Sequence, residues 1–261
     1  MIRVPPYICQ IYEVQDPCEA RQLVALGVDH IGSVLLPDGG PANARVAETI
    51  AAVRAAGAVS SLIPLFSQRD AVLEALERHR PHIVHFCEAL TLDEPGPQRL
   101  DALVALQIEV RRSFPRMRIM RSIPIGAPGR ARQVPSLELA QRFAAVSDIF
   151  LTDTVLGDGC AAADQPVSGF VGITGHVCDW QMARRLVEQS RLPVILAGGI
   201  GPHNAYAALR QVNPWGVDSC TGTNAVGADG RPVRFRKDPR KVRDMLAAVR
   251  RAGIDSPGTG R

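Results

Sequence analysis

The stretch that decides the fold covers residues 193–224, PVILAGGIGPHNAYAALRQVNPWGVDSCTGTN, because it holds a strand, a helix and a second strand in succession. Residues 194–196 form a short apolar run, typical of a strand buried on both faces of a parallel sheet. The strand ends at Gly198 and Gly199, which permit a tight turn and a close approach of ligand to backbone. A helix is predicted over 204–211 and a second strand over 217–220. Such a unit predicts a parallel sheet with helical crossovers.

The rest of the chain repeats this alternation. Each strand candidate precedes a segment whose apolar residues recur every three or four positions, as in an amphipathic helix. The eight strand candidates are residues 7–13, 30–36, 59–66, 83–88, 118–125, 149–154, 194–197 and 217–220. No GxGxxG motif follows the first, as an open dinucleotide-binding sheet would require. We therefore predict an α/β fold, a single (β/α)₈ barrel over residues 1–251 with a flexible C-terminal tail at 252–261.

Length and composition suit one globular enzyme domain. The chain has 261 residues, 46% hydrophobic and 21% charged, with a net charge of +4. It has no run of 18 apolar residues and no signal-peptide pattern at its start, so we expect a cytoplasmic protein without membrane contact. Its six cysteines lack a CxxC pair and are expected as free thiols.

A basic cluster lies near the C-terminus. It consists of Arg231, Arg234, Arg236, Lys237, Arg240, Lys241 and Arg243. Because no aromatic platform is interleaved with these residues, we interpret them as a solvated helix face and expect no nucleic-acid partner.

A long loop at residues 155–178 separates the sixth strand from its helix. Connections of this length are often active-site lids. We expect it to be mobile, with residues 172–176 over the barrel mouth.

Two loops near the C-terminus suit a phosphate group. In (β/α)₈ barrels the loops after the seventh and eighth strands usually hold a substrate phosphate. Both loops here carry small residues that can hydrogen-bond. The predicted phosphate-binding residues are Gly198, Gly199, Asn204, Asp218, Ser219, Thr221 and Gly222.

Two residues at strand ends are candidates for chemistry. Asp153 stands in the apolar run IFLTDTVL, where a carboxyl group carries a desolvation cost unless it faces the open mouth of the barrel. Cys9 holds the corresponding place on the first strand, although a free cysteine by itself more often packs as a small apolar side chain.

These motifs together resemble the phosphoribosylanthranilate isomerase family. The segments LAGGI, PHNAYAALRQV and GVDSCTG follow in the order that the family has, while YICQI and FLTDT are similar to its first and sixth strands. The resemblance implies an Amadori rearrangement of an N-linked phosphoribosyl amine, from aminoaldose to aminoketose, in tryptophan biosynthesis. It also implies Cys9 as general base, Asp153 as general acid, no cofactor, and a monomer or homodimer acting on a small phosphorylated substrate.

The chain departs from the family at several positions. The Gly after the family's Cys is Gln10 here, and residues 37–41 lack the Arg that the family's second loop supplies for the anthranilate carboxylate. Arg121 is a candidate replacement, or alternatively an ion-pair partner of Glu88 at the barrel rim. The possible substrate contacts are Gln10, His30, His85, Glu88, Arg121 and His176.

Two other functions stay open at the level of sequence. One is a divalent-metal site, although no HxH or HExxH spacing supports it. Its candidate ligands are His30, His85, Cys87, Glu88, Asp153 and His176. The other is a barrel that binds a phosphorylated metabolite without turnover, with Gln10 closing off the base.

Overall fold

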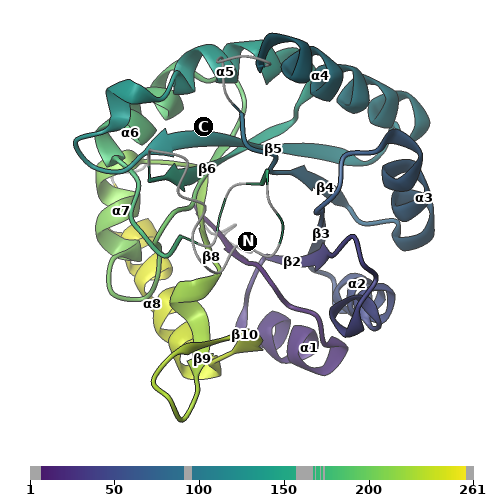
Figure 1. The fold of residues 1–261 in the computed structure, drawn as a ribbon. Coiled ribbons are helices and arrows are strands. Elements are labelled where there is room, and N and C mark those ends of the chain that lie inside the picture. Colours follow the sequence, from purple (N-terminus) through teal and green to yellow (C-terminus); the bar gives the residue numbers. More distant parts are fainter. Residues whose placement is uncertain are drawn as a thin grey trace.

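Eight parallel strands close into a barrel, as predicted (Figure 1). The computed structural model describes residues 7–90, 96–156, 167, 169, 170, 172 and 174–256. The strands are β1 (Ile8–Ile11), β2 (His30–Leu35), β3 (Val59–Pro64), β4 (Ile83–Phe86), β5 (Arg118–Gly126), β6 (Ile149–Val155), β7 (Val194–Leu196) and β8 (Gly216–Ser219). Pairing of β8 with β1, in the register Cys9 to Val217, closes the sheet.

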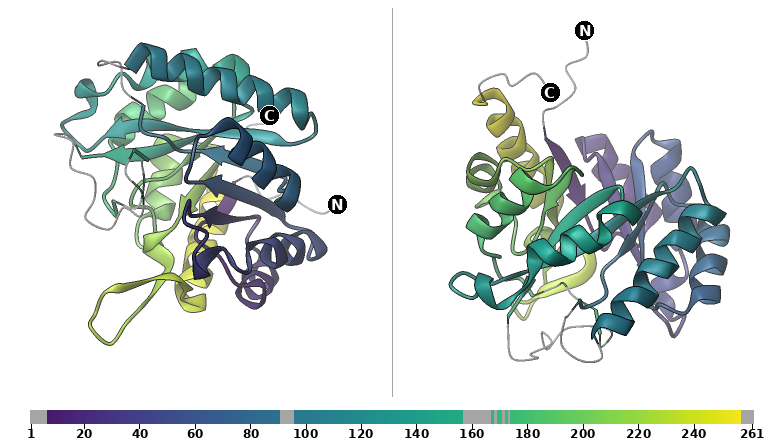
Figure 2. Two further views of the ribbon diagram at one scale, coloured as in Figure 1. Left: turned by 45° about the vertical axis from the view of Figure 1, so that its right-hand side comes forward. Right: turned by 90° about the horizontal axis from the view of Figure 1, so that it is seen from above.

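Helices form a ring around the barrel (Figures 1 and 2). They are α1 (Pro17–Leu26), α2 (Val46–Ala55), α3 (Arg69–His79), α4 (Gly96–Ser113), α5 (Ser136–Phe143), α6 (Trp180–Gln189), α7 (Ala205–Val212) and α8 (Pro239–Ile254). The last helix runs three residues into the segment that we predicted as a tail, and 257–261 lie outside the described residues. None of the described helices is both long enough and apolar enough to span a bilayer.

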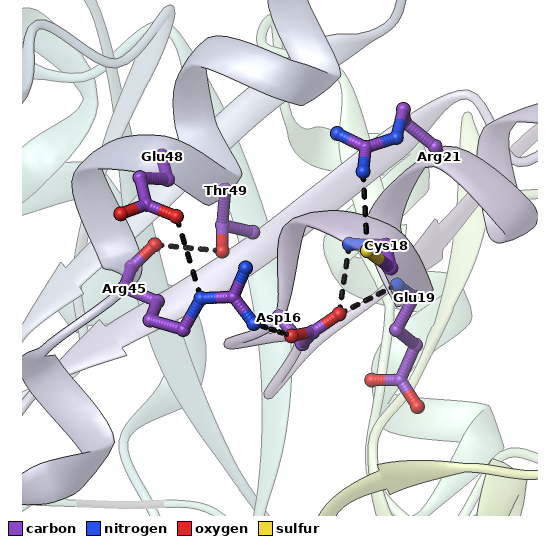
Figure 3. Close-up of polar contacts among 7 residues, drawn as sticks. All are labelled: Asp16, Cys18, Glu19, Arg21, Arg45, Glu48 and Thr49. Atoms are coloured by element: carbon purple, nitrogen blue, oxygen red, sulfur yellow. Dashed lines mark hydrogen bonds and ion pairs between the residues drawn. The ribbon is translucent and has the colours of Figure 1, made fainter.

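Asp16 fixes the start of α1 and connects it to α2 (Figure 3). Its carboxylate accepts the backbone N–H groups of Cys18 at 2.7 Å and Glu19 at 3.0 Å, which are two of the free donors of the first helical turn. Arg45, which precedes α2, pairs with the same carboxylate and with Glu48. Asp16 is therefore the N-cap of α1, and Arg45 pairs with two acidic groups.

The two faces of the sheet carry different side chains. Along β1 and the residue after it, Gln10 and Tyr12 hydrogen-bond across the barrel interior, whereas Ile11 belongs to the apolar cluster between the sheet and the helices. The interior is filled in part by the Tyr12 ring, and a Cβ atom at Gly32 would lie 2.2 Å from it. Glycine at position 32 thus makes room for an aromatic side chain inside the barrel.

A hairpin that the sequence analysis did not predict follows β8. Its strands, β9 (Asn224–Val226) and β10 (Pro232–Lys237), pair antiparallel, and the hairpin projects beyond the ring of helices (Figures 1 and 2). The interpretation of the basic cluster as one helix face is therefore wrong. Its first half lies on or beside β10, where Lys237 is buried and Arg234 pairs with Glu13, and only its second half lies on α8.

Candidate active site

A cavity of about 240 Å³ lies at the carboxyl ends of the strands. This is the end of a (β/α)₈ barrel that carries active sites. Its walls come from β2, β3, β4, β6 and β8, from the residues that follow β1 and β7, and from the segment before α6. The lining residues are Tyr12, Glu13, Val34, Ile63, Leu65, His85, Cys87, Leu151, Asp153, Gly172, Thr174, Gly175, Val177, Ala197, Gly198, Gly199, Ile200, His203, Asp218, Cys220, Thr221 and Gly222.

Gly198 and Gly199 form the wall after β7. Both have left-handed backbone conformations, with φ of 88° and 61°. A Cβ atom at Gly198 would lie 2.2 Å from Thr154 Oγ1, and one at Gly199 would lie 2.6 Å from the backbone at His176. Within the described residues, no hydrogen bond uses their N–H groups. Consecutive N–H groups in such a turn form a concave site that suits an anion.

Asn204 and Ser219 support this turn from behind. The Asn204 side chain accepts the Gly201 N–H at 2.9 Å and donates to the Gly199 carbonyl at 2.9 Å, while the Ser219 hydroxyl donates to the Ile200 carbonyl at 2.8 Å. Neither residue lines the cavity. The prediction that both bind phosphate directly is corrected: they hold the loop in shape.

Lys237 supports the second glycine-containing turn, the 3₁₀ turn Thr221–Thr223 after β8. The side chain is only 4% exposed. Its Nζ donates to the Cys220 carbonyl at 3.1 Å and to Asn224 Oδ1 at 2.5 Å, one residue on either side of the turn. A buried lysine from the hairpin therefore fixes the loop that carries Thr221 and Gly222 to the cavity.

Lys237→Met is expected to raise the KM of a phosphorylated substrate about tenfold, because the loop loses its two anchors. Since the charge of Lys237 also lowers the pKa of Asp218, its loss should in addition lower kcat at neutral pH. Steady-state kinetics, with inhibition by inorganic phosphate as a second readout, measure the effect. Lys241→Met is the matched control, since among the described residues Lys241 Nζ donates only to the Asn224 carbonyl, at 2.8 Å. Equal effects of the two changes would contradict this role for Lys237.

Asp153 and Asp218 are two carboxyl groups that share the cavity. Burial raises the pKa of Asp153 to about 7, against the lowering effect of the Thr154 N–H that it accepts at 2.8 Å. Burial also raises the pKa of Asp218 to about 7, a hydrogen bond from Gln10 lowers it, and the charge of Asp153 raises it further. Near neutral pH one carboxyl group of such a pair can be protonated while the other is ionised, as general acid and base catalysis requires.

Cys9 is not part of this cavity. Its neighbour Gln10 faces the interior, so alternation along β1 directs Cys9 to the other face of the sheet. Its side chain is 0% exposed and belongs to the apolar cluster that includes Leu23 of α1 and Met245 of α8. Burial, and then the charge of Asp29, raise the pKa of the thiol above its ordinary value. The prediction that Cys9 presents a thiolate to the substrate is wrong.

Gln10 and His30 lie below the cavity and do not line it, which corrects their prediction as substrate contacts. Gln10 Nε2 donates to Asp218 Oδ1 at 3.2 Å, and Gln10 Oε1 lies 3.2 Å from His30 Nδ1. Burial lowers the pKa of His30 to about 4, so the ring is neutral and its N–H can donate to the amide oxygen. The chain of hydrogen bonds from His30 through Gln10 thereby fixes the orientation of the Asp218 carboxyl group.

His85 lines the cavity, but both of its ring nitrogens are occupied. Nδ1 lies 2.8 Å from the Tyr12 hydroxyl and Nε2 lies 2.9 Å from Ser122 Oγ, while Tyr12 also contacts Ser61 at 2.5 Å. Burial lowers the pKa of His85 to about 3. The neutral imidazole can therefore contact a substrate through its ring, but it does not donate a proton to the substrate.

Arg121 and Glu88 pair with each other at 2.6 Å and lie outside the cavity lining. The Arg121 guanidinium is 0% exposed and stacks over Phe143 of α5 at 4.6 Å, so it lies between the sheet and the helix layer. His176 is exposed and is also outside the lining. The prediction of substrate contacts is therefore corrected for all three, and the ion-pair alternative for Arg121 is the observed one.

The candidate metal ligands do not converge. His30 lies below the cavity, Glu88 is bound to Arg121, and among the described residues no three His, Cys, Asp or Glu side chains form a group that could hold a metal ion. Part of the long loop, 157–166, 168, 171 and 173, lies outside the described residues. Its described members Gly172, Thr174 and Gly175 line the cavity mouth.

Outside the long loop, four polar lining residues were not among the predicted site residues: Tyr12, Glu13, His203 and Cys220. Side chains alternate between the two faces of a strand, so if Gln10 faces the interior, Tyr12 two positions later does as well. Glu13 has a left-handed backbone, with φ of 60°, which no pattern in the sequence indicates. Its carboxylate pairs with Arg234 of the hairpin.

Comparison with known proteins identifies the family. The family described as N-(5'-phosphoribosyl)anthranilate (PRA) isomerase matches residues 119–247, which include Asp153 and both glycine turns. N-(5'-phosphoribosyl)anthranilate isomerase 1 of Methanosarcina mazei is 30% identical over 194 residues, which are 74% of this chain and 70% of the relative. The chain belongs to the phosphoribosylanthranilate isomerase family.

Solved structures of phosphoribosylanthranilate isomerases have the same fold. That from Thermotoga maritima gives a TM-score of 0.65 at 16% identity and covers 93% of this chain and 98% of its own. A second, in complex with reduced 1-(o-carboxyphenylamino)-1-deoxyribulose 5-phosphate, gives 0.62 at 15% identity with the same coverage. At these identities the similarity extends to the fold, which agrees with the closed barrel described above.

Proposed function

We propose that this protein acts as a phosphoribosylanthranilate isomerase, an intramolecular oxidoreductase that converts an N-linked phosphoribosyl aminoaldose into the aminoketose in tryptophan biosynthesis. Family membership supports the reaction. The observation that carries the proposal is the presence of two carboxyl groups with raised pKa values, Asp153 and Asp218, in one cavity with two glycine turns.

Asp153 is proposed as the general acid. Ring opening of the furanose breaks the bond between C1 and the ring oxygen, and that oxygen needs a proton as the imine forms. A carboxyl group whose pKa burial raises to about 7 still carries its proton in a large part of the molecules at neutral pH. Among the described residues, the one hydrogen bond that favours its ionised form is that from the Thr154 N–H.

Asp218 is proposed as the general base, in place of Cys9. The second step removes the proton from C2 of the imine, so that the C1–C2 enamine forms and becomes the ketose. Asp218 is favoured as the carboxylate because Gln10 donates to it and the charge of Lys237 lowers its pKa. The glycine turns after β7 and β8 are proposed to bind the 5-phosphate through backbone N–H groups.

A purified-enzyme assay tests the proposal. The assay follows the conversion of phosphoribosylanthranilate into the aminoketose. Turnover by this protein, and growth of a tryptophan auxotroph that lacks the isomerase, are the expected results. Phosphate-ester binding without turnover would favour the non-catalytic barrel.

The pH dependence of kcat/KM is expected to be bell-shaped with its maximum near pH 7. Below this pH Asp218 gains a proton and no longer acts as a base, whereas above it Asp153 loses the proton that it must donate. Each limb should approach about a tenfold change per pH unit. Initial rates from pH 5 to 9 measure the profile, and a flat profile across this range would refute the carboxyl pair.

We also propose a cytoplasmic enzyme that acts as a monomer or homodimer without a nucleic-acid partner. The described cysteines are all free thiols, which suits a reducing compartment.

A further inference from the structure

Glu13 is a charged residue of the cavity that the proposed mechanism leaves unused. Within the described lining, the carboxyl groups belong to Glu13, Asp153 and Asp218, and the last two carry the proposed chemistry. The Glu13 side chain is 2% exposed, and its backbone has a left-handed φ of 60°, a conformation that residues other than glycine adopt at an energetic cost. A buried charge on a strained backbone at a cavity wall indicates a functional constraint.

The barrel holds the backbone on both sides of Glu13. The N–H groups of its two neighbours, Tyr12 and Val14, donate to carbonyl groups of β8 and β2 at 3.1 and 2.9 Å. Asp218 of β8 is paired in register with Gln10, so Glu13 lies beside the strand of Asp218 and three residues nearer the mouth of the cavity. The position of this carboxylate relative to the proposed base is therefore fixed by the barrel itself.

Arg234 of the hairpin holds the Glu13 carboxylate. Its Nη2 pairs with Glu13 Oε1 and its Nε lies 3.4 Å from Oε2, so the planar guanidinium group contacts both oxygens. The hairpin that carries Arg234 is itself tied to α1, because the backbone N–H of Lys237 donates to Glu19 Oε1 at 2.7 Å (Figure 1). Each carboxylate oxygen can accept more than one hydrogen bond, so the pairing with Arg234 leaves Glu13 able to accept another from a ligand in the cavity.

We infer that Glu13 accepts a hydrogen bond from the 3-hydroxyl of the substrate's ribose and selects sugars that carry this group, and that Arg234 is its positioning residue. The inference rests on the proposed function, since it takes C2 of the sugar to lie at Asp218 and the 5-phosphate at the glycine turns. C3 then lies between these two points, on the path from the deep end of the cavity to its mouth.

The chemistry of the substrate favours this hydroxyl over its other polar groups. A carboxylate that is paired with a guanidinium group accepts hydrogen bonds and donates none, so neither the phosphate nor a ring carboxylate, which are ionised at neutral pH, is its ligand. The amine loses its N–H when the imine forms, and the 2-hydroxyl loses its proton when the ketose forms. The 3-hydroxyl keeps its proton from substrate to product and can bind Glu13 throughout.

Two stable reduced product analogues test the inference in the full-length protein. One is reduced 1-(o-carboxyphenylamino)-1-deoxyribulose 5-phosphate, and the other is the same molecule without its 3-hydroxyl. Isothermal titration calorimetry measures both dissociation constants, with inorganic phosphate as competitor. We expect the wild-type protein to bind the analogue with the hydroxyl at least about tenfold more tightly, because a buried charged acceptor loses its partner in the other. Equal affinities would overturn the inference and leave the proposed function intact, whereas failure of both analogues to bind would refute the phosphate site and with it both proposals.

Glu13→Gln should reduce this preference to about threefold or less, because a neutral amide is a weaker acceptor than a carboxylate. A change that only disturbed the cavity wall would weaken both analogues alike and leave their affinity ratio at the wild-type value, and that result would overturn the role of Glu13.

Arg234→Met should lower the affinity ratio as well, and Arg234→Lys, which keeps the positive charge, should restore part of it. Arg236→Met changes an exposed arginine of the same strand and is the matched control, which should keep the wild-type ratio. A wild-type ratio in Arg234→Met would overturn the positioning role of Arg234.

Discussion

Asp153→Asn and Asp218→Asn are each expected to lower kcat at least about 10³-fold while leaving the affinity for inorganic phosphate within about threefold. An amide has nearly the shape of the carboxyl group but neither donates nor accepts a proton at neutral pH, so the variants lose an interaction made only in the transition states. Both side chains lie in the cavity beside the glycine turns and not within them. Single-turnover kinetics with phosphoribosylanthranilate, and phosphate titration, measure the two quantities.

Cys9→Ala is the control that distinguishes Asp218 as the general base from Cys9, the general base that the family resemblance implies. Because the thiol faces the helix layer, its loss should leave kcat within about threefold and lower the stability by about 1 kcal/mol through the small void. Thermal unfolding monitored by circular dichroism measures the stability. Loss of turnover in Cys9→Ala, together with an active Asp218→Asn, would show that the thiol is the base and that β1 has the opposite face inward.

The barrel was predictable because its determinants are local. The continuous apolar run at Val194–Leu196 and the glycines that follow it specify a buried parallel strand and its exit without reference to the rest of the chain. The same pattern repeats, and each predicted strand lies within three residues of the observed bounds. The Asp229-Gly230 pair between β9 and β10 is a hairpin signal of the same local kind, although basic residues around it also suit a solvated helix face.

The direction of the β1 side chains was not predictable from local pattern. A shift of one residue turns every side chain of a strand to its opposite face, and ICQI has neither an alternating pattern nor a second polar residue to decide between the faces. The hydrogen-bond partners of Gln10 determine which face points inward. They are Asp218 and His30, which are 208 and 20 residues away in the sequence. Long-range polar pairs of this kind become visible only when the barrel closes, so the sequence alone could not show that Asp218 faces the cavity and that Cys9 does not.

Gly199→Ala is expected to lower kcat/KM about 10²-fold, mostly through KM. The new methyl group would lie 2.6 Å from the backbone carbon of His176 and the backbone nitrogen of Val177, and the residue would keep a left-handed φ of 61°, which L-amino acids adopt at a cost of about 1 to 2 kcal/mol. The turn must move away from the segment 176–177, so its N–H groups no longer converge on the phosphate. Inhibition by inorganic phosphate should weaken to a similar degree.

Gly57→Ala separates the cost of the left-handed backbone from the clash with segment 176–177. Gly57 follows α2 with a φ of 80°, and a Cβ atom there would meet nothing within 4 Å, so the variant carries the backbone cost without a clash at the cavity. It should unfold at a lower temperature than the wild type and keep the wild-type KM. If Gly199→Ala binds phosphate as the wild type does, the anion is held elsewhere. The site would then have to be sought among the remaining polar residues of the lining, Thr174, His203 and Thr221.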